Sequence, residues 1–388
     1  MTSTRANDAE PGAAASDRQR VTVYNVAQRA GVSIATVSYA FRRPDKVRPE
    51  TRDRVLAVAD DLGYVPRASA RSLAEGQTGV LGLFAFDMLI DRPLGTVAAS
   101  TAFDTATETI AWSALPEDEV SNPLAFPLYA DEVQRGFELE CRALGRSLLI
   151  SGGEVRSSDV RETAGRVDGL AVFPHGADRS EAVMAALRSI AKTVPVVLFA
   201  VPADAAEPFH YVTADNSGGM FALAQHLVLT HGVRRVHYLG QRDEVDLRDR
   251  FDGLVAATAA AGIAAPSHGL DVAEADLADL RAHLDELLGT EAGLPDAFVC
   301  DNDQRALLLM EELRWRGIRV PHDVIVTGFD GTIAGLLSSP TLTSVRQPMV
   351  SMGMIAARVL ATPELAGSAR LHYRLGTELR LRQSCGCG

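Results

Sequence analysis

The sequence predicts a small all-α head at the N-terminus and an α/β body made of two doubly wound parallel-sheet lobes. Two short helical patterns flank a glycine at position 31, and a third helical pattern follows at 49–62. Beyond residue 78, short apolar strands alternate with amphipathic helical segments, which is the pattern of parallel sheets covered by helices. A chain of 388 residues is long enough for a head and two such lobes.

The head has the pattern of a helix-turn-helix. Val26, Ala27 and Ala30 recur at helical spacing, Gly31 permits a tight turn, and Ser33 stands where a second helix needs its N-cap. A second helix that presents short side chains near its N-terminus can enter a major groove and contact base edges. The alternative is a helical hairpin that only packs against its neighbours.

Charge is divided unevenly along the chain. Between positions 18 and 72 the sequence has eleven basic and five acidic residues, a balance of plus six, whereas the whole chain carries minus twelve. The remainder is therefore near minus eighteen. A basic head on an acidic body is expected of a protein that binds nucleic acid through the head.

Five motifs occur together in the head: VTVYNVA at 21–27, AGVS at 30–33, TVS at 36–38, VRPETR at 47–52 and LGYVP at 62–66. This combination resembles the headpiece of LacI/GalR-family transcriptional regulators. The resemblance implies a DNA-binding domain at 20–66, whose DNA contacts come from Thr22, Tyr24, Ser33, Ile34, Ala35, Thr36, Ser38, Tyr39, Arg42, Lys46, Arg48 and Arg52.

The outward positions of the second helix depart from the family pattern. Family members make base contacts from the positions that Ile34, Ala35 and Tyr39 occupy here. Tyr39 stands where relatives frequently carry arginine, so a bidentate contact with guanine is missing at this position. The sequence of the operator half-site therefore does not follow from the resemblance.

A short segment at 67–77 follows the head. By itself it predicts a linker, because its helical stretch is too short to be stable alone. The resemblance implies a hinge helix that orders on DNA, with Ala70 entering the minor groove and Leu73 wedging between base steps.

The resemblance continues through the body and implies two lobes of periplasmic-binding-protein type within 78–388. Lobe 1 is expected at about 78–213 plus 345–371, and lobe 2 at about 214–344 plus 372–388. Strands are predicted at 80–86, 147–151, 169–173, 196–199, 211–213, 235–239, 297–300 and 324–329. Helices are predicted at 132–144, 182–191, 218–231, 251–261, 276–288, 303–316 and 349–360. Residues 87–127 break the pattern and predict an insertion that is a lid, a dimer contact or a solvated excursion, the last being favoured.

Polar residues follow the predicted strands of lobe 2, where parallel sheets bind ligands. The resemblance implies that Arg248, Asn302 and Asp330 bind a small-molecule effector. One alternative is that Asn302 and Asp303 cap the next helix, and another is that Arg248 pairs with a neighbouring aspartate. The cap is favoured for Asp303, and ligand binding is favoured for Arg248 and Asp330.

The cysteines and histidines match no metal motif. Cys141 and Cys300 lie in apolar runs and are predicted core residues. Cys385 and Cys387 could chelate a metal or respond to oxidation, but a free mobile end is favoured, since no second pair stands at finger spacing. The histidines at 226, 231 and 237 are predicted to be ordinary surface or core residues.

No catalytic residue, cofactor or metal site is predicted, because no phosphate loop, zinc-protease motif or nucleophile elbow occurs. The segment 1–19 lacks a signal-peptide core and no apolar run reaches membrane-spanning length, so a disordered tail and a cytoplasmic protein without membrane contact are expected. Residues and resemblance together predict a ligand-responsive repressor that binds a near-palindromic double-stranded DNA operator as a homodimer. Its effector is a sugar or related metabolite by family resemblance. The rival hypothesis is a solute-binding or sugar-processing protein whose basic head is incidental.

Overall fold

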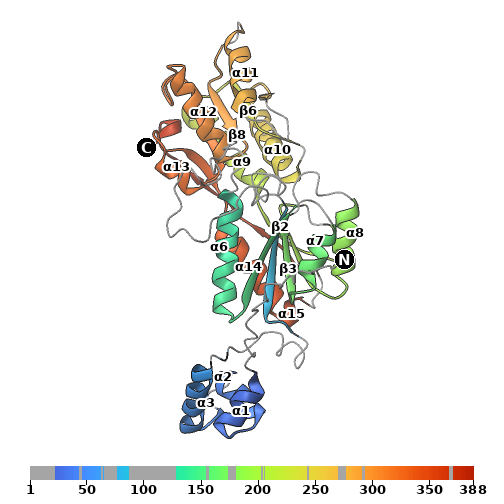
Figure 1. The fold of residues 1–388 in the computed structure, drawn as a ribbon. Coiled ribbons are helices and arrows are strands. Elements are labelled where there is room, and N and C mark those ends of the chain that lie inside the picture. The colour runs from blue at the N-terminus through green and yellow to red at the C-terminus, as the bar shows by residue number, and fades with distance from the viewer. Residues whose placement is uncertain are drawn as a thin grey trace, which may run out of the picture. The chain divides into compact units, whose positions relative to one another are not determined.

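The chain divides into two compact units, residues 1–76 and 77–388. The computed structural model describes residues 22–42, 46–62, 64, 77–86, 128–153, 157–173, 181–201, 204, 206–242, 244–269, 277–290, 293–366 and 370–388 (Figure 1). The predicted tail at 1–19, the linker up to residue 76 and the insertion at 87–127 lie outside the described residues. Among the described helices, none is long and apolar enough to cross a membrane.

The first unit packs three described helices around an apolar core. They are α1 (Val23–Ala30), α2 (Ile34–Arg42) and α3 (Pro49–Leu62). The N–H of Thr22 donates to Asn25 Oδ1 at 2.8 Å before α1, and Gly31 ends that helix with a left-handed φ of 65°. The helix-turn-helix predicted from the glycine and the cap position is therefore present. The buried core side chains are Val26, Ala27, Ala30, Val37, Ala40, Val55 and Ala59.

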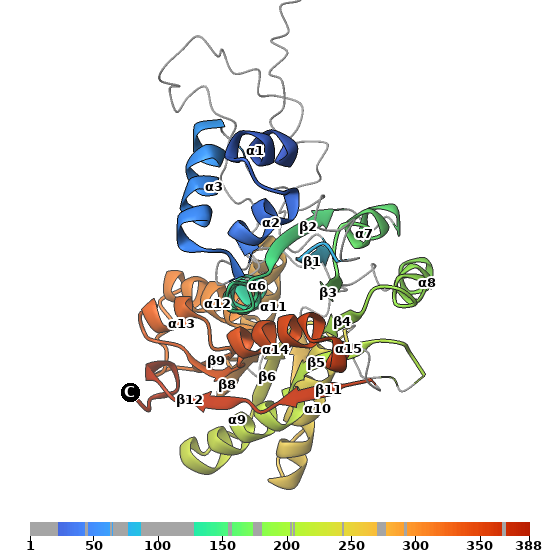
Figure 2. The same ribbon diagram turned by 90° about the horizontal axis from the view of Figure 1, so that it is seen from below.

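The first lobe of the second unit is built on a parallel sheet. Its strands run in the order β11 (His372–Leu375), β5 (His210–Ala214), β4 (Val196–Phe199), β3 (Gly169–Phe173), β1 (Val80–Phe86) and β2 (Ser147–Gly153). One face carries α6 (Leu128–Ala143) and α14 (Met349–Ala361), and the other carries α7 (Ser157–Ala164) and α8 (Glu181–Ile190), as Figure 2 shows. Leu81 and Leu83 of β1 pack against the first pair of helices, whereas Phe84 packs against the second pair.

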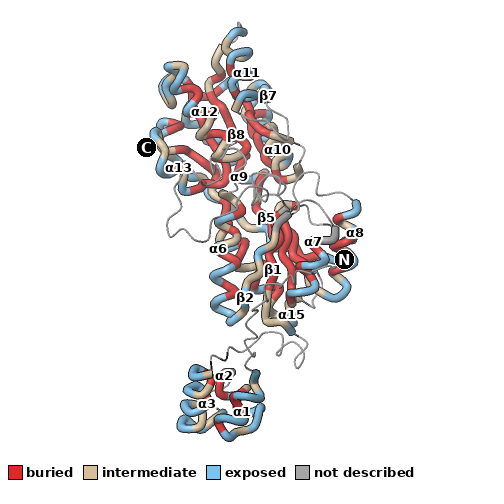
Figure 3. Tube along the Cα trace, in the orientation of Figure 1, coloured by how far each residue is buried: buried red, intermediate tan, exposed pale blue. Residues whose placement is uncertain are grey.

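The second lobe has the same construction. The strand order is β12 (Glu378–Arg380), β10 (Thr343–Arg346), β9 (Ile325–Asp330), β8 (Ala297–Cys300), β6 (Val236–Leu239) and β7 (Ser267–Gly269), with β12 antiparallel to β10. Helices α9 (Asn216–His231) and α10 (Val245–Ala260) cover one face, and α11 (Leu277–Leu288) and α12 (Asp303–Trp315) cover the other. β6, β8 and β9 are buried along their whole length, and the interior of this lobe around β8 is accordingly red in Figure 3. Shorter elements are α13 (Ile333–Leu337), α15 (Pro363–Ala366) and the 3-10 turn η5 (Gln383–Cys385).

The apolar strands were predictable and the polar ones were not. The strands at 80–86, 169–173, 196–199 and 297–300 have the predicted bounds, and the core positions of Cys141 and Cys300 are confirmed. The structure adds β7, β10, β11 and β12, which lack an apolar run. β10 lies wholly in the second sheet and β11 in the first. The chain therefore changes lobe after Arg346 and after Leu375, within a few residues of the boundaries expected at about 345 and 372.

α6 and α14 approach each other backbone to backbone. A Cβ atom on Gly136 would lie 1.9 Å from the carbonyl oxygen of Val350, and one on Gly353 would lie 1.9 Å from the carbonyl oxygen of Val133. Only glycine fits at these two contacts. Because of this contact, α14 packs tightly against α6, which is the first helix of lobe 1 among the described residues.

Candidate nucleic-acid interface and ligand site

Helix α2 turns one face to the core of the head and another to solvent. Val37 and Ala40 are buried, whereas Ile34 is 40% exposed and Tyr39 is 48% exposed. Ala35 is exposed beside them. The three side chains expected to contact bases are thus accessible on a helix that is anchored by its opposite face.

Ser33 caps the start of α2. Its Oγ accepts a hydrogen bond from the Thr36 N–H at 3.1 Å and lies 2.9 Å from the Thr36 hydroxyl. Ser33 is exposed, so the partial positive charge of this helix end is open to solvent. Such an end can receive a phosphate oxygen.

The remaining residues predicted to contact DNA differ in their exposure. Thr22 and Tyr24 are exposed, and Ser38 is half-buried. Among the cations, Lys46 and Arg48 are exposed. Outside the described residues lie the side chain of Arg42 and the predicted hinge residues Ala70 and Leu73.

Arg52 carries a local constraint. Its Nη2 and Nε lie 3.0 and 3.1 Å from Oδ1 of the adjacent Asp53. Both side chains are more than one-third exposed, so this ion pair is weak. A phosphate group can therefore compete with Asp53 for the guanidinium.

In the second unit, Asp330 ends β9 and lies buried against Arg250, which is not among the effector-binding residues predicted from the sequence. Arg250 Nη1 lies 3.4 Å from Asp330 Oδ1, and both side chains are less than one-tenth exposed. Gln347 Nε2 donates to the same oxygen at 2.7 Å. Burial raises the pKa of Asp330 to about 7, although Arg250 acts to lower it. The φ of Asp330 is 102°, which is strained for a residue with a Cβ and is typical of functional turns.

Arg250 is held by polar partners on three sides. Its Nε donates to Asn216 Oδ1 at 3.0 Å, and its Nη1 donates to the carbonyl oxygen of Asp301 at 2.5 Å. The guanidinium lies over the Phe329 ring, 4.0 Å from the centroid. The side chain is therefore fixed at the carboxyl ends of β8 and β9.

Arg248, the arginine predicted to bind the effector, is placed elsewhere. It is exposed, and its Nε donates to the carbonyl oxygen of Arg242 at 3.3 Å. Two residues turn an α-helix by about 200°, so Arg248 and Arg250 point to opposite sides of α10. The predicted helix began at 251, whereas α10 begins at Val245. Extending the apolar periodicity backward from Leu254 by four residues would have placed Arg250 on the buried face.

Asn302, rather than Asp303, caps α12. Asn302 Oδ1 accepts from the Arg305 N–H at 2.8 Å. Asp303 is the first residue of the helix and is buried, and its carboxylate accepts from the Thr332 N–H at 2.6 Å and from the Ser344 hydroxyl at 2.5 Å. The cap favoured for Asp303 is therefore wrong, because this carboxylate ties the turn after β9 to β10.

A cavity of about 300 Å³ lies between the two lobes. Asp246 lines it and connects it to the buried cluster, since its carboxylate is hydrogen-bonded to the side chain of Asn216, the acceptor of Arg250. Burial raises the pKa of Asp246 to about 6. The predicted ligand residues Arg248, Asn302 and Asp330 are not among the described residues that line it. Those residues are Val201, Thr213, Ala214, Ser217, Val245, Asp246, Asp249, His372 and Arg374.

A bidentate ion pair joins the lobes near the turn after Asp330. Arg346 of β10 donates to Glu132 of α6, from Nη1 to Oε1 at 3.1 Å and from Nη2 to Oε2 at 2.5 Å. Nη1 of Arg346 also donates to the carbonyl oxygen of Gly331 at 2.9 Å. A change in lobe spacing would have to break or stretch this pair.

The C-terminal cysteines are not a free end, so that prediction is wrong. Cys385 is 1% exposed. Cys387 Sγ lies 3.2 Å from His231 Nε2 and 3.5 Å from His226 Nε2. Sequence spacing could not show this contact, because the partners are 156 and 161 residues apart.

Comparison with known proteins identifies both units. Residues 22–67 match the model of bacterial regulatory proteins of the lacI family, and residues 224–385 match the model of the periplasmic binding protein-like domain. The HTH-type transcriptional regulator Rv3575c of Mycobacterium tuberculosis is 32% identical over 399 residues, covering 95% of this chain and 98% of that protein. The chain belongs to the LacI family. It is therefore a DNA-binding transcriptional regulator.

Other LacI-family relatives agree with this assignment. The regulator DegA of Bacillus subtilis is 26% identical over 341 residues, covering 86% of this chain and 88% of DegA. The lac repressor dimer bound to operator and the anti-inducer ONPF has a TM-score of 0.70 and 22% identity, with 95% of this chain and 99% of that chain covered. A complex of the transcriptional regulator CelR with cellobiose has a TM-score of 0.59 and 25% identity, with 94% and 100% covered. The predicted fold is confirmed, and these relatives are transcriptional regulators rather than enzymes.

Proposed function

We propose that this regulator represses transcription as a homodimer on a near-palindromic operator, and that a small molecule bound between its lobes controls its DNA binding. The observation that carries the DNA side is the outer face of α2. Ile34, Ala35 and Tyr39 are exposed there, while the opposite face is packed into the head. A helix anchored in this way can lie in a major groove without losing its support.

A dimer follows from the proposed mode of binding. Each head reads one half-site, and a two-fold axis relating two chains requires matching half-sites. The lac repressor structure named above is a dimer bound to operator, which supports the same arrangement here. A regulator that acts on chromosomal DNA works in the cytoplasm.

Two head variants of the full-length protein separate base recognition from phosphate binding. Tyr39→Ala should change which bases are preferred, since the ring is exposed on the face of α2 that is proposed to contact base edges. Arg52→Ala should weaken binding to all sequences alike and reduce the salt slope by about one. Both are measured by selection from randomised DNA and by salt titration. A change in overall affinity alone from both variants would contradict the assignment of α2 as the recognition helix.

The ligand side rests on the cavity between the lobes. Its polar lining includes Asp246, Asp249, His372 and Arg374, which offer acceptors and donors for vicinal hydroxyl groups. A volume of about 300 Å³ falls at the small end of ligand pockets and suits a compact ligand. The CelR complex contains cellobiose, which supports a sugar or related polyhydroxylated metabolite as the class.

A matched pair of variants on α10 tests this cavity. Asp249→Asn alters a carboxylate that lines the cavity, whereas Asp252→Asn alters an exposed carboxylate on the same helix outside it. Operator binding is measured against a panel of sugars. Asp249→Asn should reduce the ligand response while leaving ligand-free DNA binding unchanged. Arg248→Ala, which the sequence alone predicted to abolish the response, should leave it intact, because the structure places Arg248 outside the cavity lining. If Asp249→Asn and Asp252→Asn responded equally to the ligand, the cavity would not be the ligand-binding site.

Removing the head tests whether DNA binding depends on residues 1–76. The fragment 77–388 should lose salt-dependent DNA binding, because the basic excess lies before residue 76. Unchanged DNA binding by this fragment would contradict the proposed function as a whole.

A further inference from the structure

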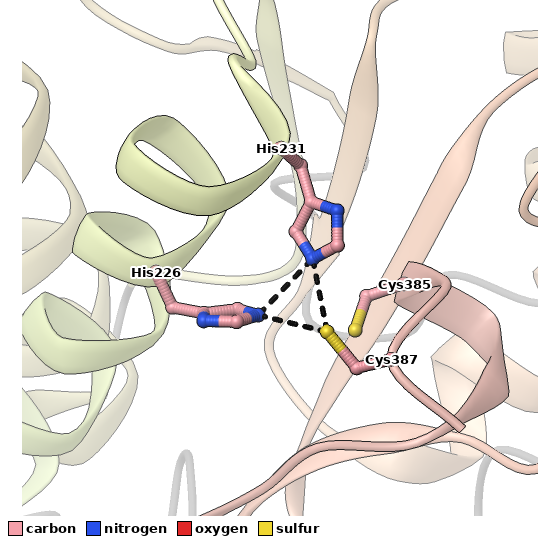
Figure 4. Close-up of side chains that lie close together, drawn as sticks. All are labelled: His226, His231, Cys385 and Cys387. Carbon is pink, nitrogen blue, oxygen red and sulfur yellow. Dashed lines mark hydrogen bonds between the residues drawn. The ribbon is translucent and has the colours of Figure 1, made fainter.

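Two histidines and two cysteines from distant parts of the chain converge at one end of the second lobe (Figure 4). His226 and His231 lie in the last turns of α9, Cys385 ends η5, and Cys387 follows two residues later. One nitrogen or sulfur atom from each side chain lies within 4.8 Å of the other three. We propose that these four side chains bind one zinc ion in a structural His₂Cys₂ site.

The distances between the ligand atoms match a tetrahedral zinc site. His226 Nε2 and His231 Nε2 are 3.1 Å apart, and Cys387 Sγ lies 3.5 and 3.2 Å from them. With Zn–N bonds of about 2.0 Å and Zn–S bonds of about 2.3 Å, a tetrahedron separates two nitrogens by roughly 3.3 Å and nitrogen from sulfur by roughly 3.6 Å. An ion at the centre therefore requires only small side-chain movements, the largest of them at Cys385.

The chemistry of the ligands selects zinc among common divalent ions. Imidazole nitrogen and thiolate sulfur are zinc ligands, whereas magnesium and calcium are bound by oxygen. Within the described part of the chain, the cluster contains two imidazoles and two thiols and no carboxylate. Four protein ligands complete the tetrahedron, which is the arrangement of a structural site rather than a catalytic one.

The backbone brings both cysteines to the histidines without help from a metal. The Ser384 hydroxyl donates to the carbonyl oxygen of Val326 at 2.6 Å, which fastens the C-terminal segment to β9. Gly386 has a φ of 91°, a conformation that favours glycine, and it turns the chain between Cys385 and Cys387. Both sulfur atoms therefore lie near the end of α9 (Figure 4).

Hydrogen bonds outside the cluster orient two of the ligands. His226 Nδ1 lies 3.2 Å from the Thr230 hydroxyl. Metal-bound histidines commonly use their other nitrogen in such a bond, which leaves Nε2 for the ion. The Thr343 hydroxyl donates to Cys385 Sγ at 3.1 Å and would stabilise a thiolate there. On zinc binding, both thiols release their protons to solvent.

The site is separate from the cavity between the lobes. Ser217 lines that cavity near the start of α9, and His231 ends the same helix. Fourteen residues of helix span roughly 21 Å. Zinc would therefore fasten the C-terminal segment to α9 and stabilise the second lobe, whether or not an effector is bound.

Metal analysis of the full-length protein, purified without a histidine tag, tests the proposal. The wild-type protein should contain one zinc ion per chain. Cys387→Ser and His226→Gln should each lose it, whereas His322→Gln, which alters an exposed histidine of the same lobe outside the cluster, should retain it. Thr230→Val should weaken zinc affinity by about 10–100-fold, as the loss of an outer hydrogen bond does.

Two further measurements do not depend on zinc carried through purification. Cobalt added to the reduced apoprotein should give the visible spectrum of a tetrahedral thiolate site, and Cys387→Ser should abolish that spectrum. A zinc chelator should lower the thermal midpoint of the wild type and leave that of Cys387→Ser unchanged; Cys387 is exposed, so this variant should fold. Absence of zinc and cobalt binding in the reduced protein would overturn the proposal. A disulfide between Cys385 and Cys387 in metal-free protein would instead assign the pair to redox chemistry.

Discussion

Replacing Arg250 by methionine should strongly destabilise the second lobe. The side chain is 6% exposed, and its loss leaves the Asp330 carboxylate buried without its cation and Asn216 Oδ1 without its donor. Removing one partner of a buried ion pair typically costs about 3–5 kcal/mol of the free energy of unfolding. Arg248→Met, two residues earlier on the exposed face of the same helix, should change it by no more than about 0.5 kcal/mol.

The pH dependence of this effect has a definite sign. Burial raises the pKa of Asp330 to about 7 from its ordinary value of 3.8. Between these values the folded state binds more protons than the unfolded state, so the contribution of Asp330 to stability falls as the pH rises. Arg250 acts to lower the pKa of Asp330. In Arg250→Met that pKa should therefore lie above 7, and the stability should continue to fall as the pH rises beyond 7. The difference between wild type and Arg250→Met should grow from pH 6 to pH 8.

Urea unfolding of the full-length proteins, followed by circular dichroism at pH 6 and pH 8, measures both effects. Adding Asp330→Asn to Arg250→Met should recover part of the stability and remove the extra pH dependence, because no buried carboxylate then remains unpaired at that position. Equal unfolding midpoints for Arg250→Met and Arg248→Met at pH 8 would refute this reasoning about the cluster.

Three other variants test contacts elsewhere in the second unit. Gly353→Ala should lower the thermal midpoint, since its Cβ would meet the carbonyl oxygen of Val133. Such overpacking costs about 1–3 kcal/mol of the free energy of unfolding. An unchanged midpoint would mean that α6 and α14 can separate freely. Burial lowers the pKa of His237 to about 4, so the unfolded state takes up a proton near pH 6.5 while the folded state does not. Stability should therefore fall from about pH 6.5 toward pH 4, by up to about 3 kcal/mol relative to His237→Gln, and parallel pH profiles would contradict this. Arg346→Gln should release Glu132 and speed hydrogen exchange at the start of α6 by roughly tenfold, and Arg346→Lys should restore little because lysine cannot form the bidentate contact.

Whether a candidate site could be predicted from the sequence depends on how close together in the chain its residues lie. The helix-turn-helix of the head could be predicted from the sequence, because its glycine turn, serine cap and periodic alanines lie within a few residues of one another. The position of Asp330 at the end of β9 also followed, since an apolar run marks the strand before it. The partner of Asp330 did not follow, because choosing Arg250 over Arg248 requires the true start of α10 and hence the direction of each side chain.

The sequence by itself determined the elements whose residues signal locally: the three helices of the head, the apolar strands of both sheets and the concentration of positive charge before residue 76. The tertiary structure decided which distant residues meet. It placed the polar strand β11 in the first sheet, paired Arg346 with Glu132 across the lobes and brought the C-terminal cysteines to the histidines of α9. Periodicity and caps act over one or two turns of chain, whereas these contacts depend on how two sheets and their covering helices pack.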